Sequence, residues 1–462
     1  MKQVFAWAVL SYLRALARLA LFIHNPQVIG ITGSVGKSSA RDAIYAVLKD
    51  FVPTTSIEKG NSESGVPLGI LGISMENYST LAWAEAMVKA PFGINFLSHT
   101  KYLIIEMGVD DPYPPKNMGY HLTIAKPQIA VFLNTFAVHT MQFEKTLTDA
   151  ERQALKNNPE KLTNTLISKI AHEKARIITE SGCRVGIYNG DNTFVVEAIQ
   201  KAKQNNSLLL SFGNDSSNSI YYGKYEVDLK GTLFTFYLNW ENKKESILLK
   251  IQNYALPKEY QEIISSAVLI GKYAGLSNYQ ITSSLQKNFK LPAGRSTLLE
   301  GINDSVIIDS SYNASKASVL AFLELCLVLK AKTNRPFVFV FGDMRELGDE
   351  AEHEHEAIRK QLVGHVDSLI CVGPLTRQYV FEPFQKENAD VKIEWFPNAN
   401  DAGEYLKKHM PDNSLVLVKG SQNTIFLEEA IKYVLKDQND VRKLCRQNLY
   451  WMGVKEKAEK KT

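Results

Sequence analysis

Hydrophobic and polar residues alternate along this chain in the manner of an α/β protein. Short apolar runs bounded by polar residues or glycine are typical of buried parallel strands. Between them lie longer stretches in which apolar residues recur three or four positions apart, a spacing that predicts helices. The regular succession of the two patterns in the C-terminal part predicts a parallel sheet of Rossmann-like α/β type. The runs that predict its strands are SVIIDS, PFVFVFGDM, SLICVG, KIEWFPN and SLVLVKG.

A different pattern covers residues 207–253, where short groups of Tyr, Phe, Val, Ile and Leu alternate with polar residues. This pattern predicts an antiparallel β-meander, with turns near Lys230 and near Asn242. The next stretch, ALPKEYQEIISSAVLIGKYAG, predicts a helix, whereas residues 51–72 carry few periodic signals and predict a loop. We therefore expect a central domain with a mostly parallel sheet and this small meander, followed by the Rossmann-like domain.

The first residues, MKQVFAWAVLSYLRALARLALFI, are strongly apolar yet include Lys2, Arg14 and Arg18. The two arginines are four positions apart and share one helical face. We expect an amphipathic helix over residues 1–24. Two interpretations are open: the helix lies on a membrane surface with its arginines toward lipid headgroups, or it packs on the adjoining domain.

Composition and charge exclude several classes of protein. The 462 residues include 53 Lys and Arg against 49 Asp and Glu, so no strong field for polyanions is present and nucleic acid is not expected as a partner. The four cysteines are scattered without a CxxC pair, which favours neither a zinc site nor a disulfide framework and suits a reducing cytosol. They are Cys183, Cys326, Cys371 and Cys445.

The first chemical motif is VIGITGSVGKSSA at residues 28–40, a β-branched run that breaks into glycines and is followed by a helical pattern. Glycines allow backbone N–H groups to approach phosphate oxygens, and the helix N-terminus adds positive potential. Lys37 supplies charge and the Ser38 hydroxyl can bind Mg²⁺, so the motif predicts a nucleoside triphosphate site. The expected nucleotide contacts are Thr32, Gly33, Ser34, Val35, Gly36, Lys37, Ser38 and Ser39.

Candidate metal ligands follow the next two predicted strands. The run KYLIIEMGVDD predicts a buried strand that ends at Glu106, and a second strand is expected over residues 128–135, shortly before His139. A carboxylate at the carboxyl end of a strand beside a phosphate loop suits Mg²⁺.

The spacing Gly-x-Thr-Gly-x-x-Gly-Lys-Ser resembles that of the Mur ligase family, the ATP-dependent amide-forming enzymes of peptidoglycan precursor synthesis. Glu106 resembles the family's Glu-x-Gly, and Asn134 and His139 resemble its Asn-x-x-x-x-His. The resemblance implies that Glu106 and His139 bind metal together with Ser38. The stretch KGNSESGVPLGIL resembles the loop that follows the phosphate loop in the D-alanyl-D-alanine-adding ligases, which implies a substrate-binding role for Asn61.

The helical stretch ISKIAHEKARIITE resembles the family's helix with a carbamylated lysine, here Lys174. The resemblance implies that the carbamate holds a second Mg²⁺ and that Asn189 and Asp191, after the next strand, contact the nucleotide. In the family a His-Asn pair usually opens the later helix at ALPKEYQE, and this sequence lacks that pair.

The boundary PAGR resembles the family's Gly-Arg hinge, which implies that Arg295 contacts the triphosphate. The following IDSSYNAS resembles the family's Asp-Asp-Ser-Tyr-Asn-Ala-Asn-Pro, implying catalysis by Asp309 and substrate contacts by Tyr312 and Asn313, the latter also facing the nucleotide. Ser310 replaces the second aspartate. This change either weakens catalysis or leaves the role to Asp309.

Two later motifs resemble the D-alanyl-D-alanine-adding branch of the family. FGDMRELGDEAEHEH resembles its Gly-Asp-Met-x-Glu-Leu-Gly with a later histidine, and VLVKGSQN resembles its Val-Lys-Gly-Ser-Arg. The resemblance implies that these motifs bind substrate through Asp343, Glu346, His355 and Lys419.

The expected organisation is an amphipathic helix over 1–24, an ATP-binding Mur ligase domain over 25–294, a Rossmann-like ligase domain over 295–436 and a basic polar tail over 437–462. Only 27 residues precede Val28, so we do not expect the family's N-terminal domain for the uridine-diphosphate sugar.

The resemblance implies an ATP- and Mg²⁺-dependent ligase that phosphorylates a substrate carboxylate and joins it to an amine. The expected substrates are a small-molecule or lipid-linked cell-wall precursor and D-alanyl-D-alanine or a similar amine. A ligase for another polymer is an alternative, as is a non-catalytic nucleotide-binding relative, which Ser310 and the missing His-Asn pair favour. We expect a cytoplasmic monomer, with contact to the inner face of the membrane if the N-terminal helix lies on lipid.

Overall fold

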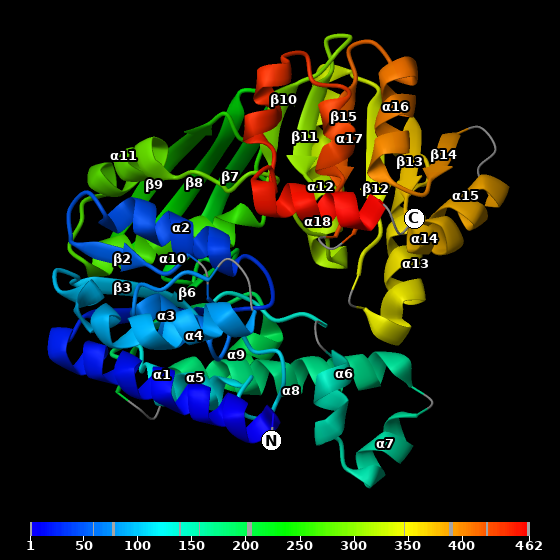
Figure 1. Ribbon diagram of the computed structural model, residues 1–462. Coiled ribbons are helices and arrows are strands. Elements are labelled where there is room, and N and C mark those ends of the chain that lie inside the picture. Colours follow the sequence, from blue (N-terminus) through cyan, green and yellow to red (C-terminus); the bar gives the residue numbers. More distant parts are fainter. Residues whose placement is uncertain are drawn as a thin grey trace. The chain divides into compact units, whose positions relative to one another are not determined.

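The computed structural model (Figure 1) describes most of the chain and divides it into two compact units. Unit 1 comprises residues 1–224, 235–249 and 260–290; unit 2 comprises residues 225–234, 250–259 and 291–462. The described residues are 2–58, 60–75, 79–137, 140–156, 158–200, 206–345, 347–387, 391–421 and 424–459.

The first sheet has nine strands in the order β2-β3-β1-β4-β5-β6-β7-β8-β9, and neighbours from β2 to β7 pair in parallel. Its central strands consist almost entirely of buried apolar residues, as parallel strands covered on both faces require. The strands are β1 (Gln27–Thr32), β2 (Thr54–Ser56), β3 (Tyr102–Glu106), β4 (Ile129–Phe132), β5 (Val185–Asn189), β6 (Leu208–Gly213), β7 (Ile220–Asp228), β8 (Gly231–Trp240) and β9 (Lys243–Gln252).

The predicted meander is the end of this same sheet. Strands β7, β8 and β9 are joined by two-residue turns, which only antiparallel neighbours allow. The second turn has φ of 48° at Glu241 and 61° at Asn242, the left-handed geometry of a tight hairpin. The turns thus lie where the sequence predicts them.

Helices flank the first sheet (Figure 1). The expectation of a plain loop over residues 51–72 is wrong in part, because that stretch contains β2 and the short helix α3. The helices are α1 (Lys2–His24), α2 (Lys37–Leu48), α3 (Gly65–Ile70), α4 (Thr80–Lys89), η1 (Ala90–Leu97), α5 (Met118–Ile124), α6 (Thr140–Phe143), η2 (Glu144–Thr146), α7 (Asp149–Leu155), α8 (Pro159–Thr179), α9 (Thr193–Ile199), α10 (Tyr260–Tyr273) and α11 (Asn278–Asn288).

Helix α1 packs on unit 1 through one face. Leu13, Ala17 and Ala20 have no exposed surface and belong to the core cluster that also includes the central strands. Among the described residues, one stretch is long and apolar enough to cross a membrane, Ala6–His24 of this helix, with a mean hydropathy of 1.5 and 28% of it buried. The core-packing interpretation of the helix is therefore confirmed for this face.

The sheet of unit 2 has the order β10-β11-β15-β12-β13-β14, in which only the β10–β11 pair is antiparallel. The predicted Rossmann-like α/β fold is confirmed. Phe339 of β12 stacks on Phe337 and Phe341 of the same strand. The strands are β10 (Thr297–Glu300), β11 (Val306–Ser310), β12 (Phe337–Gly342), β13 (Ser368–Val372), β14 (Lys392–Phe396) and β15 (Leu415–Lys419).

Residues Gln438–Lys443 and Leu449–Glu459 are helical and belong to unit 2, where Trp451 contacts Phe426 edge to face. The helices of this unit are α12 (Lys316–Thr333), η4 (Gly348–Glu350), α13 (Ala351–Leu362), α14 (Pro374–Thr376), η5 (Arg377–Phe381), α15 (Glu382–Glu387), α16 (Ala399–His409), α17 (Glu428–Lys432), η6 (Gln438–Lys443) and α18 (Leu449–Glu459).

All four cysteines are buried free thiols. Cys183 lies in unit 1, and Cys326, Cys371 and Cys445 lie in unit 2. Burial raises the pKa of each thiol, and that of Cys445 reaches about 12.

Candidate functional site

The carboxyl ends of four neighbouring parallel strands form one edge of the first sheet. In the order β3-β1-β4-β5, Glu106 ends β3, the phosphate loop follows Thr32 of β1, Asn134 follows β4 and Asn189 ends β5. Residues far apart in the sequence thereby meet at the edge where open α/β sheets bind ligands.

The phosphate loop leads directly into α2. Gly36 has φ of 83°, a left-handed conformation that glycine adopts without strain, and no side chain caps the helix that begins at Lys37. The first N–H groups of α2 therefore have no capping side chain, the arrangement that binds phosphate. Lys37 Nζ lies over the loop and donates to the carbonyls of Gly33 (2.8 Å) and Ser34 (3.3 Å). Thr32 is buried and donates to the Met107 carbonyl (2.9 Å), so its hydroxyl holds two strand ends together.

Asn134 fixes the shape of the phosphate loop. Its carbonyl accepts from Ser34 N–H (3.0 Å), and its side-chain Oδ1 accepts from Val35 N–H (3.0 Å). These two N–H groups, expected to contact nucleotide, are thus engaged inside the protein. Asn134 Nδ2 in turn donates to Glu262 Oε2 (2.9 Å) on α10. Sequence reasoning missed Glu262, since nothing near it in the chain marks a partner 128 residues away.

Glu106 is buried between a cation and a hydroxyl. Oε1 accepts from Arg41 Nη1 (2.8 Å), and Oε2 accepts from Ser38 Oγ (3.1 Å). The pair of Ser38 and Glu106 oxygens is the hard donor set that Mg²⁺ prefers. Arg41, which sequence reasoning also missed, orients this carboxylate. His139 lies outside the described residues, and within the described ranges no group of three His, Cys, Asp or Glu side chains could hold a metal ion.

Lys174 of α8 reaches the same loop. Its side chain is buried, and Nζ lies 3.5 Å from the Gly33 carbonyl. Burial, with the neighbouring Lys37 charge, lowers the pKa of Lys174 to about 7. About half of the amine is therefore neutral at neutral pH.

Three further predicted residues of unit 1, Asn189, Asp191 and Asn61, make hydrogen bonds within the protein. Asn189 Oδ1 accepts from Asp191 N–H (2.9 Å), and the Asp191 carboxylate accepts from the backbone N–H and the side chain of Asn214. Asn61 accepts from Gly108 N–H through its carbonyl (2.9 Å). A Cβ at Gly108 would lie 2.8 Å from that carbonyl, so the close approach requires glycine here.

In unit 2 the carboxyl ends of β11, β15 and β12 bring a second cluster together. Lys419 ends β15 and lies beside Ser310 in the register of the sheet. Its buried Nζ donates to Ser310 Oγ (3.1 Å) and to the Asn313 carbonyl (3.0 Å). Burial and the Arg295 charge lower the pKa of Lys419 to about 7, and burial raises the pKa of Asp309 to about 6.

Ser310→Asp is expected to raise the pKa of Lys419 by about one or more, because a carboxylate would replace the hydroxyl that now accepts from Nζ. The measurement is an NMR titration of the Lys419 side chain in the labelled protein. Ser310→Asn is the neutral control of similar size. An unchanged Lys419 titration in Ser310→Asp would contradict the contact.

Tyr312 lies close to two guanidinium groups. Arg295 Cζ is 4.7 Å from the ring centroid, and Arg446 Cζ is 5.6 Å from it. Arg446 also donates to the carbonyls of Ser311 and Tyr312, both at 3.0 Å. Its buried ion pair with Glu428 (2.6 Å) holds it in place. Arg446, which sequence reasoning missed, therefore anchors the loop that follows β11.

Asp343 and His355 order the loop after β12. Asp343 Oδ1 accepts from Thr376 N–H (2.8 Å), and burial raises the pKa of Asp343. His355 Nε2 accepts from Met344 N–H (3.0 Å), so the ring proton is on Nδ1 and is donated to Ala351 O (2.6 Å). Burial lowers the pKa of His355. Both ring nitrogens contact backbone, which suits a positioning role; Glu346 lies outside the described residues.

Comparison with known proteins agrees with this architecture. Residues 294–422 match the family described as Mur ligase, glutamate ligase domain. The UDP-N-acetylmuramoyl-tripeptide–D-alanyl-D-alanine ligase of Buchnera aphidicola subsp. Baizongia pistaciae is 23% identical over 90% of this chain and 79% of its own length. The ligase of the same name from Bacillus subtilis is 23% identical over 92% of this chain and 80% of its own. The solved MurF ligase from Thermotoga maritima, in complex with ADP, has a TM-score of 0.68 at 18% identity, covering 94% of this chain and 84% of that one.

The matches define the class: this chain has the Mur ligase fold and contains a Mur ligase glutamate ligase domain. Within that class it is a homologue of the UDP-N-acetylmuramoyl-tripeptide–D-alanyl-D-alanine ligases, over 90% of its length for the Buchnera protein. The resemblance that the sequence motifs indicate is confirmed.

Proposed function

We propose that the protein is an ATP-dependent ligase that joins a carboxylate to an amine. The observation that carries this proposal is the phosphate loop, with Lys37 over its carbonyls and the Ser38–Glu106 pair at the start of α2. In the proposed reaction the γ-phosphoryl group of ATP passes to a carboxylate oxygen and ADP leaves. The amine then attacks the acyl carbon, a C–N bond forms, phosphate leaves and the amine proton is released.

The residues of unit 1 would act on the triphosphate. Lys37 and the N–H groups of α2 would bind its oxygens and offset the negative charge that develops during transfer. Glu262 and Asn134 hold the loop in shape for this contact. Ser38 and Glu106 would hold Mg²⁺, which when bound neutralises phosphate charge.

The environment of Lys174 suits carbamylation. A carbamate forms from carbon dioxide and a neutral amine, and the pKa of about 7 supplies that neutral form. The reaction converts the cation into an anion beside the phosphate loop. We propose that this anion is a ligand for a second Mg²⁺, with His139.

The substrates are proposed from the names of the relatives. A cell-wall precursor with a peptide carboxylate would be the acceptor, and D-alanyl-D-alanine or a similar amine would be the second substrate. The cluster of Asp309, Asn313 and Lys419 in unit 2, with the Asp343 loop, would bind them. We place the enzyme in the cytoplasm as a monomer, with α1 at the inner face of the membrane.

Phosphate release from ATP is expected to depend on the added amine, and Lys37→Ala is expected to lower it by about a hundredfold or more. The lysine is the first residue of α2 and does not belong to the core, so circular dichroism of the variant should match the parent. Lys49→Ala, an exposed lysine after the same helix, is the matched control. Phosphate release that depends neither on the amine nor on Lys37 would overturn the proposal and favour a non-catalytic relative.

A further inference from the structure

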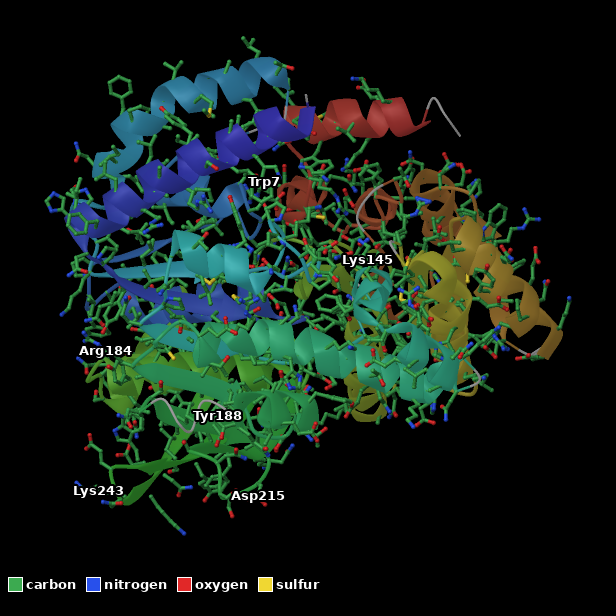
Figure 2. The ribbon with its side chains drawn as sticks, turned by 90° about the horizontal axis from the view of Figure 1, so that it is seen from below. Trp7, Lys145, Arg184, Tyr188, Asp215 and Lys243 are labelled. Atoms are coloured by element: carbon green, nitrogen blue, oxygen red, sulfur yellow. The ribbon has the colours of Figure 1, made fainter. Side chains whose placement is uncertain are left out.

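An exposed apolar surface extends over α1 and the adjoining α4–η1 segment. Two contacts hold the segments side by side: Tyr12 of α1 donates to the Met87 carbonyl (3.3 Å), and His24 lies 2.9 Å from the Ile94 carbonyl. Figure 2 shows the two helical segments next to one another, with aromatic side chains standing out from them. The sequence predicts only the first of the two segments as a surface helix.

The side chains on this surface are large, apolar and almost fully exposed. Phe22 of α1 is 84% exposed, and on the neighbouring segment Leu81, Val88 and Phe92 are 80%, 70% and 81% exposed. Exposed apolar residues are common singly, but a group on two packed helices is typical of an interaction site. We call this group the apolar face.

A cationic hollow borders the apolar face. It has a volume of about 420 Å³, and its lining includes Arg18, Lys126, Arg176 and Glu180 beside uncharged residues of α5. Arg18 lies one helical turn before Phe22, so the hollow and the apolar face adjoin on α1. Arg176 is paired with Glu173 and Glu180, whereas within the described ranges Arg18 and Lys126 form no ion pair.

We infer that the apolar face and the hollow together bind an anionic phospholipid bilayer, with the apolar side chains among the acyl chains and a headgroup phosphate in the hollow. This inference deepens the proposed function, since it names the surface and the lipid chemistry by which the enzyme would meet the membrane. The combination of apolar side chains and flanking cations is that of interfacial helices. The side chains stand out from the surface, and a fluid bilayer accepts such projections without the complementary pockets that a protein partner would need.

The buried face of α1 determines which variants can test the inference. Leu13, Ala17 and Ala20 belong to the core, so deletion of the helix would disturb unit 1 as well as any lipid contact. The test therefore uses point substitutions of exposed residues in the full chain.

The experiment is sedimentation of the nucleotide-free protein with phosphatidylglycerol–phosphatidylcholine vesicles and with pure phosphatidylcholine vesicles. The parent should bind the anionic vesicles, and the double variant Phe22→Ser, Phe92→Ser should bind them at least about tenfold more weakly. Arg18→Glu should weaken binding about fivefold or more, and only to the anionic vesicles. Tyr279→Ser, which removes an aromatic ring that is 80% exposed on α11, is the matched control and should bind as the parent does.

Absence of vesicle binding by the parent, or equal binding by the parent and the double variant, would overturn the inference. Self-association of the parent without vesicles, measured by ultracentrifugation, would also overturn the inference if the same substitutions abolish it. That result would show that the apolar face is a protein interface. The assay contains no ATP, amine or carboxylate. Failure of the lipid inference is therefore separable from failure of the ligase proposal, which amine-dependent phosphate release measures.

Discussion

Lys174→Ala is expected to lose ligase activity by about a hundredfold or more while it keeps its fold. The proposed carbamate places a negative charge beside the phosphate loop, and alanine cannot form it. A short carboxylate such as formate or acetate can occupy the vacated volume and supply the charge. We therefore expect partial recovery of Lys174→Ala at millimolar formate, and none for Lys174→Arg, whose cation opposes a metal ion.

The measurements are amine-dependent phosphate release and ¹³C NMR of protein incubated with labelled bicarbonate. Lys161→Ala, an exposed lysine of the same helix, is the control. Parent-like activity of Lys174→Ala, with no carbamate signal in the parent, would contradict the assignment. Wild-type activity should also rise with pH between about 6 and 8 at fixed carbon dioxide, because the neutral amine increases through its pKa of about 7.

The lowered pKa of Lys174 makes the stability of the folded protein depend on pH. The value for Lys174 in the folded protein, about 7, lies below the ordinary lysine value of 10.5. Between these values the unfolded chain binds more protons at this residue than the folded chain. The contribution of Lys174 to the free energy of unfolding therefore rises with pH across that window and is least favourable below pH 7.

Arg446→Ala is expected to lower the stability of unit 2 by about 3 kcal/mol. The substitution removes one partner of Glu428, whose side chain is fully buried, and leaves the Ser311 and Tyr312 carbonyls without their donor. Lys455 remains 2.8 Å from Glu428 and prevents a larger loss of stability. The measurement is alkylation of Cys445 as a function of urea concentration, since that thiol adjoins Arg446 and is buried.

Arg442→Ala is the matched control, because it removes the same charge from an exposed position four residues earlier. We expect it to leave the urea midpoint almost unchanged. Equal midpoints for the two variants would show that Arg446 does not anchor the loop after β11. A reduced turnover of Arg446→Ala at urea-free conditions, where unit 2 is folded, would link that anchor to catalysis through Tyr312.

Much of the fold follows from local patterns in the sequence. Strands β12, β13 and β15 of unit 2 are nearly continuous apolar runs, and the second meander turn contains Asn242, a residue type that tolerates positive φ. Apolar runs and turn residues are therefore sufficient to locate these elements, whereas the sequence does not predict the short strand β10. The phosphate loop and the strand ending at Glu106 are equally local. Their meeting at one sheet edge follows from parallel pairing alone.

The parts that could not be predicted depend on long-range partners. Glu262 and Arg446 act through contacts with residues more than a hundred positions away, and neither has a distinctive neighbour in the sequence. Helix α3 is short and contains two glycines and a proline, so its sequence does not show the spacing of apolar residues that predicts a helix. The exposure of Phe92 could not be foreseen either, because an apolar residue in a helix is ordinarily assigned to the core.

The burial of the four thiols determines how fast the cysteines are oxidised in oxidising surroundings. Thiolates are the species that react with disulfides and peroxides, and burial with a raised pKa suppresses the thiolate at all four cysteines. Oxidation of these four cysteines therefore requires an opening of the fold. The chemical lifetime of the enzyme at these positions is therefore governed by its opening kinetics, separately at Cys183 in unit 1 and at the three thiols of unit 2.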